Sequence, residues 1–117
     1  MVLAADRFQV AAFEEFTLWQ VENNGAEWLE LRGPKSVLRA SRVKARLLVN
    51  SRDVLQSWAD GGNPEKRAVG LSVTTATRFG KHELEFRYCT WRPLRVSRPQ
   101  ARALLALMDH IIAFIAQ

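Results

Sequence analysis

The pair Asn24-Gly25 constrains the fold of this chain more than any other feature of its sequence. Both residue types accept a positive φ, so a two-residue turn of this kind joins two antiparallel strands into a hairpin. Residues 16–21 and 26–32 flank the turn and carry apolar side chains on both faces. Pairing around the turn predicts three opposed pairs: Val21 with Trp28, Trp19 with Glu30, and Leu18 with Leu31.

A second hairpin is predicted from residues 68–77 and 82–91, closed by residues 78–81 with Phe79-Gly80 as the turn. Its apolar side chains alternate with polar ones, which is typical of a strand buried on one face only. A slip of one residue would bury the charged face, so the pattern specifies the register. The apolar face is expected to hold Val69, Leu71, Val73, Thr75, Leu84, Phe86 and Tyr88, and the polar face Ser72, Thr74, Glu83, Glu85 and Arg87.

The segment between the hairpins contains one more predicted strand and one short helix. In residues 43–49, apolar side chains alternate with Lys44 and Arg46, which predicts a strand with a basic outer face. Ser51 is placed to cap a short helix that buries Val54, Leu55 and Trp58. Residues 36–41 are a connector of open form. In residues 1–15, Phe8, Val10 and Ala12 alternate as they would in a strand, but the alanines of this segment favour a helix or a mobile arm.

The C-terminal residues predict one long helix. Ser97 can cap it, and Pro99 suits its first turn. Between Ala101 and Ala116 almost every side chain is apolar, which is more than a helix packed on one face of a single sheet needs to bury. A surplus of this kind usually marks an interface, so we expect a homodimer. The expected interface residues are Leu107, Ile111 and Phe114.

These elements predict an α+β fold in a single domain of residues 1–117, because 117 residues is an ordinary domain length. The expected fold is one antiparallel sheet of about five strands, made of the two hairpins and the basic strand, with the short helix and the long C-terminal helix packed on it. No internal repeat is evident beyond the two hairpins.

Several classes of protein are disfavoured by what the sequence lacks. A single cysteine, Cys89, cannot form an intrachain disulfide or a multi-cysteine metal site. No apolar run is long enough to span a membrane, and the N-terminus has no secretory pattern, so a cytoplasmic protein is expected. Phosphate loops, paired-histidine metal motifs and nucleophile elbows are missing, so we expect neither an enzyme nor a bound metal or cofactor.

The charge of the chain is the strongest indication of function. The net charge is +5 and the isoelectric point is about 10.1. Residues 1–31 carry six acidic side chains against one basic one, whereas residues 32–52 and 87–102 carry seven and five bases and no acid. Cations interleaved with aromatic side chains are typical of proteins that bind single-stranded nucleic acid. We expect single-stranded DNA or RNA to bind a basic sheet surface made of Arg39, Arg42, Lys44, Arg46, Trp91, Arg92 and Arg95.

The C-terminal part resembles a known family of nucleic-acid-binding proteins. A curved hairpin is followed by residues 94–104 (LRVSRPQARAL), in which a strand ends in a small polar cap, and then by a long apolar helix. This order resembles the end of the transcriptional-coactivator/Whirly group of single-stranded-DNA-binding proteins. The resemblance implies that the open face of the sheet takes the nucleic acid and that helices pair across a dimer. Glu83 and Glu85 would lie on that open face.

An alternative interpretation involves no nucleic acid. The apolar C-terminal helix and the hairpin that carries Trp19 and Trp28 also suit a small protein-interaction module or adaptor. Nucleic acid that stays bound through purification would favour the first interpretation, and clean protein would favour the second.

Overall fold

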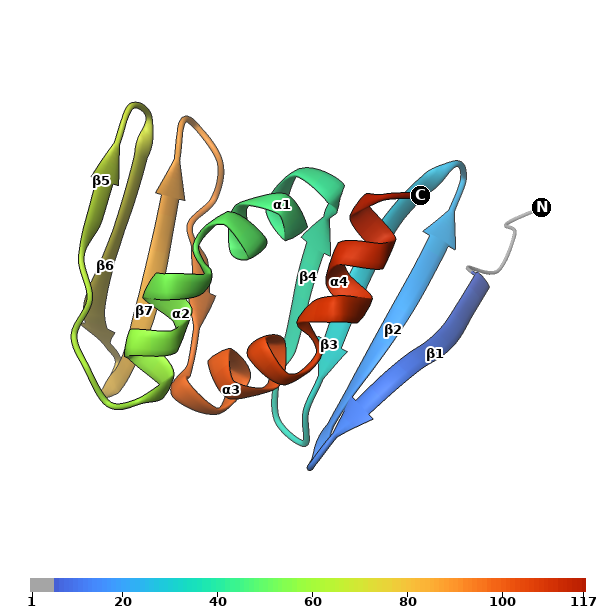
Figure 1. Cartoon of the computed structure of the whole chain (residues 1–117), viewed down its shortest axis with the longest axis horizontal. Helices are drawn as coiled ribbons and strands as arrows, with labels where there is room; N and C mark the ends of the chain where they lie inside the picture. The colour runs from blue at the N-terminus through green and yellow to red at the C-terminus, as the bar shows by residue number, and fades with distance from the viewer. Residues whose placement is uncertain (1–5) are drawn as a thin grey trace. The chain divides into compact units, whose positions relative to one another are not determined.

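The structure, a computed structural model, describes residues 6–117, which form two compact units. Of the described residues, the first unit consists of residues 6–51 together with Ala103–Gln117, and the second consists of Arg52–Arg102. Each unit is built on its own four-stranded antiparallel sheet (Figure 1).

The sheet of the first unit has the strand order β1-β2-β3-β4. Its strands are β1 (Asp6–Phe13), β2 (Phe16–Asn23), β3 (Ala26–Arg32) and β4 (Val37–Ser41). The turn between β2 and β3 has φ values of 52° at Asn24 and 82° at Gly25. The register of the first predicted hairpin is confirmed: Val21 pairs with Trp28, Trp19 with Glu30, and Leu18 with Leu31.

Two segments of the first unit differ from the sequence prediction. Residues 6–13 form a strand, the alternative that their alternating pattern left open, rather than the favoured helix or arm. Residues 1–5 of this segment lie outside the described residues. Residues 43–49 belong to the helix α1 (Arg42–Asn50), so the predicted basic strand is wrong. The helix starts there because the Ser41 hydroxyl accepts a hydrogen bond from the Lys44 backbone N–H at 3.4 Å. Ala45 and Leu48, three residues apart, then face the core.

The helices α1 and α4 (Met108–Ile115) pack against one face of this sheet (Figure 1). Alternate residues of the strands point toward them. The core between sheet and helices contains Leu18, Leu29, Leu31, Leu38, Ala40, Leu48, Leu104 and Ile111.

The sheet of the second unit has the strand order β5-β6-β7-β8. Its strands are β5 (Lys66–Ala68), β6 (Leu71–Arg78), β7 (Lys81–Tyr88) and β8 (Leu94–Val96). Its helices are α2 (Arg52–Ala59) and α3 (Arg98–Ala106), and the last turn of α3 belongs to the first unit. The predicted turn at Phe79-Gly80 is confirmed. The strand predicted from Ala68 is interrupted, because Gly70 has a φ of 75° and Val69 is fully exposed.

The C-terminal segment is two helices rather than the predicted long one. The chain leaves helical geometry at Leu107, where φ is −102° and ψ is 13°, and α4 begins at Met108. Neither glycine nor proline stands at this position, so the sequence carries no local signal for the break.

The predicted sheet of about five strands is therefore wrong, although the α+β class holds. Residues 6–117 form two separate four-stranded sheets and four helices. Alternation shows that a strand has one buried face, but it does not show which strands share a sheet, and this is why the two hairpins were expected in one layer.

The two sheets are built by similar stretches of sequence, a repeat that the sequence analysis missed. Residues 29–32 (LELR) correspond to residues 84–87 (LEFR), and residues 38–42 (LRASR) to residues 94–98 (LRVSR). In both halves four antiparallel strands lead through a serine into a helix, and a second helix follows. Residues 6–117 thus contain two copies of one ββββαα arrangement.

The second helix of each half lies in the unit of the other half. The Arg42 guanidinium, at the start of α1, stands 4.8 Å from the centre of the Phe114 ring of α4. Its counterpart Arg98, at the start of α3, stands 3.7 Å from the centre of the Trp58 ring of α2. The second half therefore supplies α4, with Phe114, to the core of the first unit, and the first half supplies α2, with Trp58, to the core of the second unit.

Candidate nucleic-acid interface

The candidate site lies on the face of the first sheet that points away from α1 and α4. Because side chains alternate along a strand, the residues between the core positions share this opposite face. It carries Thr17 and Trp19 on β2, Trp28, Glu30 and Arg32 on β3, and Arg39 on β4.

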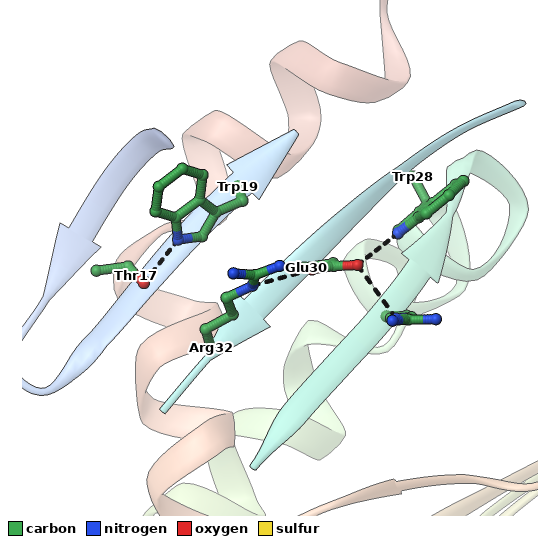
Figure 2. A network of polar contacts seen from close by, with 6 residues as sticks. Thr17, Trp19, Trp28, Glu30 and Arg32 are labelled. Carbon is green, nitrogen blue, oxygen red and sulfur yellow. Dashed lines mark hydrogen bonds and ion pairs between the residues drawn. The ribbon is translucent and has the colours of Figure 1, made fainter. Parts of the chain in front are cut away.

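Glu30 is the centre of this face, with a side chain that is 0% exposed. One carboxylate oxygen, Oε1, accepts hydrogen bonds from Arg32 Nε at 3.0 Å and from Arg32 Nη2 at 2.6 Å. The other, Oε2, accepts from the Trp28 indole N–H at 2.8 Å (Figure 2). The same oxygen forms an ion pair with Arg39 Nε at 3.1 Å. The register explains the geometry, since Arg39 pairs directly with Glu30.

The pKa of Glu30 reflects two opposed influences. Burial raises this pKa, because the charged form loses its hydration. The hydrogen bonds from Trp28 and Arg32, with the positive charges of Arg32 and Arg39, lower it by more. The pKa of Glu30 is consequently below the ordinary value, and the carboxylate is charged at neutral pH.

Trp19 holds the Arg32 side chain from the other side. The Arg32 guanidinium carbon stands 5.4 Å from the centre of the Trp19 ring, within the range of a cation–π contact. The Trp19 indole N–H donates to the Thr17 hydroxyl at 2.8 Å, which fixes the plane of the ring (Figure 2). Arg32 is therefore held between an aromatic ring and a carboxylate.

The basic residues predicted for the site are not brought together on one strand. Arg39 is on the open face, with a side chain that is 66% exposed. Lys44 and Arg46 lie on α1, where a separation of two residues turns them to different sides of the helix. Arg42 is bound inside the unit, because its Nη2 donates to Glu27 Oε2 at 2.9 Å.

The remaining predicted residues belong to the second unit. Trp91 follows β7 and packs against Tyr88, with ring centres 4.9 Å apart. Arg92 is exposed in the same connection. Arg95, on β8, donates from Nε to Glu85 Oε2 at 3.1 Å. The predicted surface is therefore divided between the two units.

The predicted interface residues Leu107, Ile111 and Phe114 are buried within a single chain. Their exposed fractions are 4%, 1% and 1%. The surplus of apolar side chains that suggested a dimer is consumed by the exchange of helices between the two halves.

Trp19, Trp28, Glu30 and Arg32 were missed as site residues by the sequence analysis, although its predicted register opposed Trp19 to Glu30 and placed Trp28 in the same hairpin. The signal that would have found them is the repeated pattern of glutamate with arginine two residues later, together with an arginine before each helix cap. Arg32 was counted in the basic stretch but was not assigned a role.

The described residues contain neither a cluster that could hold a metal nor a helix that could cross a membrane. Within residues 6–117, no group of three or more His, Cys, Asp or Glu side chains could hold a metal ion. None of the helices in this range is long and apolar enough to cross a membrane.

Comparison with known proteins gave no match: no family model, no curated protein and no solved structure is significantly similar to this chain.

Proposed function

We propose that this protein binds single-stranded nucleic acid, DNA or RNA, through the open face of the β1–β4 sheet. The single observation that carries the proposal is the buried Glu30, which holds two arginines at fixed positions beside two tryptophans. A guanidinium has several N–H donors, so Arg39, which uses Nε for Glu30 and is largely exposed, has others for a phosphate.

Aromatic rings beside fixed cations suit single-stranded nucleic acid better than a duplex. Bases of a single strand are free to stack on indole rings, and Trp19 and Trp28 are both partly exposed on this face. Glu30 is the acid at the centre of this group, and its two arginines leave an excess of positive charge. Arg7 on β1 adds a further cation to this face of the sheet. It pairs with Val21 of β2, which lies on the same face as Trp19.

The resemblance to the transcriptional-coactivator/Whirly group rests on a strand, a serine cap and a helix, and the structure has this sequence of elements at residues 94–106. The Ser97 hydroxyl accepts from the Gln100 backbone N–H at 3.2 Å, and Ser41 does the same for α1. A strand ending in a small polar cap thus occurs in both halves, whereas the long apolar helix of the resemblance is two helices, α3 and α4.

The proposal needs only one chain. The homodimer stays a prediction, and it would need a surface other than the buried side chains of Leu107, Ile111 and Phe114. A cytoplasmic location is part of the proposal, because Cys89 is an exposed free thiol, which suits a reducing compartment.

Fluorescence anisotropy with a labelled oligothymidine of about 20 nucleotides, longer than one such surface covers, tests the proposal. We expect the wild type to bind the single strand more tightly than a duplex of equal length, and to bind less tightly as salt rises. Arg39→Ala should flatten the salt dependence by about 0.7, the value for one phosphate contact. Arg52→Ala removes an exposed charge from α2 and should leave the dependence unchanged.

Trp19→Ala, which removes a stacking surface, should weaken binding about tenfold at constant salt. No binding at low salt, or equal effects of Arg39→Ala and Arg52→Ala, would contradict the proposal. Capture of a folded protein by the same face would favour the interaction module instead.

A further inference from the structure

The open face of the second sheet contains a hollow beside the turn between β6 and β7. Its volume is about 260 Å³, and it is lined by Arg78, Phe79, Lys81, Glu83 and Arg95. These residues come from both strands of the hairpin and from β8. The lining carries three cations and one acid, so the hollow attracts anions.

The two arginines that line this hollow lie beside a buried carboxylate, as arginines do in the first unit. Glu85 has a side chain that is 6% exposed. Its Oε1 accepts from Arg87 Nε at 2.5 Å and its Oε2 from Arg95 Nε at 3.1 Å, while Arg78 Nη1 lies 4.0 Å from Oε2. Glu85 therefore fixes the arginines at the edge of the hollow before any ligand arrives.

Phe79 is displayed at the rim in a conformation that costs stability. It has a φ of 51° and is 98% exposed. The corresponding turn of the first unit uses Asn24 at a φ of 52°, a residue type that adopts this conformation readily. A bulky ring in the left-handed region and in solvent has no packing reason, and strain of this kind is typical of functional positions.

We propose that this hollow is a second binding site, which takes one nucleotide of a single strand. The phosphate would contact Arg78, Lys81 and Arg95, and the base would stack on the Phe79 ring. The proposal rests on the proposed function for the nature of the polymer, but the site is built from residues of the second unit alone.

A small ligand tests the site independently of the first unit. The probe is a thymidine dinucleotide with a 5′-phosphate, titrated into the full chain while the arginine Nε–Hε resonances are followed by NMR. We expect the Arg78 and Arg95 resonances to shift. Unchanged Arg78 and Arg95 resonances would overturn this site, even if the long oligothymidine still binds through Arg39.

Substitution of Phe79 separates base stacking from a generic apolar contact. Phe79→Leu keeps an apolar side chain, and Phe79→Asn favours the turn. Both should weaken binding of the dinucleotide about tenfold, the effect of one lost stacking contact. If Phe79→Leu binds as tightly as the wild type, the base does not stack there and the proposal is wrong.

The phosphate contact is tested by Arg78→Ala with Lys81→Ala, against Lys35→Ala with Arg52→Ala, which removes the same charge from exposed positions outside both sheet faces. Only the first pair should weaken the dinucleotide. Equal losses in both pairs would reduce the effect to net charge and would overturn the site. If the dinucleotide shifts Arg95 while Arg39→Ala leaves the long strand unaffected, this site stands and the proposed face on the first sheet fails.

Discussion

Glu30 and Glu85 occupy the same position in the two sheets. Each is buried in the third strand of its sheet and is bonded to the arginine two residues later. Each also pairs with an arginine on the fourth strand, which forms an ion pair with it. A buried carboxylate stabilises a fold only when its charge is paired, and here each one is paired with more than one cation. In both halves, the ion pairs that stabilise the buried carboxylate also fix the positions of surface arginines.

Glu30→Gln should destabilise the protein by about 2 kcal/mol. The amide keeps the volume of the side chain but loses the charge-assisted bonds from Arg32 and Arg39. Urea denaturation followed by tryptophan fluorescence measures the change in the free energy of unfolding. Glu22→Gln, at an exposed position of β2, is the control and should change it little. Equal values for the two variants would mean that the Glu30 network does not stabilise the sheet.

Acid should remove the contribution of Glu30. Its pKa is lowered in the folded protein, so the folded state binds fewer protons than the unfolded state in the acidic range. The stabilisation is fully present above the ordinary glutamate pKa and is lost as the pH falls through that value toward the lowered one. The difference in unfolding free energy between the wild type and Glu30→Gln should therefore shrink on acidification. A difference that stays constant down to acidic pH would contradict the assignment.

How much of this could be read from the sequence depends on the range of the interaction. The turns at Asn24-Gly25 and Phe79-Gly80, and the registers around them, follow from local chemistry and were predicted. Residues 43–49 alternate as a strand would, and the prediction followed that pattern, but the Ser41 cap starts a helix at Arg42. The exchange of α2 and α4 depends on contacts far apart in the chain, to which no local pattern refers.

The same limit explains the candidate site. Arg39 was predicted because it lies in an acid-free basic stretch, but its partner Glu30 was assigned only to a hairpin face. The pairing of β3 with β4 brings Arg39 to Glu30. The sequence analysis left residues 36–41 as a connector of open form, so it predicted no such pairing. Charge counting found the cations and missed the carboxylate that positions them.

Phe114→Ala should destabilise the chain by about 3–5 kcal/mol, the usual cost of removing a large buried aromatic side chain. Phe114 is 1% exposed and lies under the Arg42 guanidinium. Ile112→Ala, on the same helix but 40% exposed, should have a much smaller effect. Two measurements distinguish a core role of Phe114 within one chain from a role in a dimer interface: thermal unfolding of the two variants, and sedimentation of the wild type. A stable, monomeric Phe114→Ala protein derived from a dimeric wild type would support the dimer instead.

Ser97→Ala should cost about 1 kcal/mol by uncapping α3. The Ser97 hydroxyl accepts from the Gln100 backbone N–H, and the Gln100 side-chain oxygen accepts from the Ser97 backbone N–H at 2.9 Å. This reciprocal pair satisfies two N–H groups that the helix itself cannot satisfy. Ser97→Asp keeps an acceptor at the cap and should restore most of the loss in a urea titration. An Asp variant as unstable as the Ala variant would show that the cap is not the cause.

Exchanging the first residue of the two hairpin turns should move stability in opposite directions. Asn24 and Phe79 have nearly the same φ, 52° and 51°, and each precedes a glycine of positive φ. Asparagine tolerates this conformation, whereas a bulky side chain is strained there by about 1–2 kcal/mol. Phe79→Asn should therefore raise the midpoint of thermal unfolding, and Asn24→Phe should lower it. If Phe79→Asn also lowers the midpoint, the Phe79 ring contributes contacts that outweigh the strain, and it is retained for folding rather than for binding.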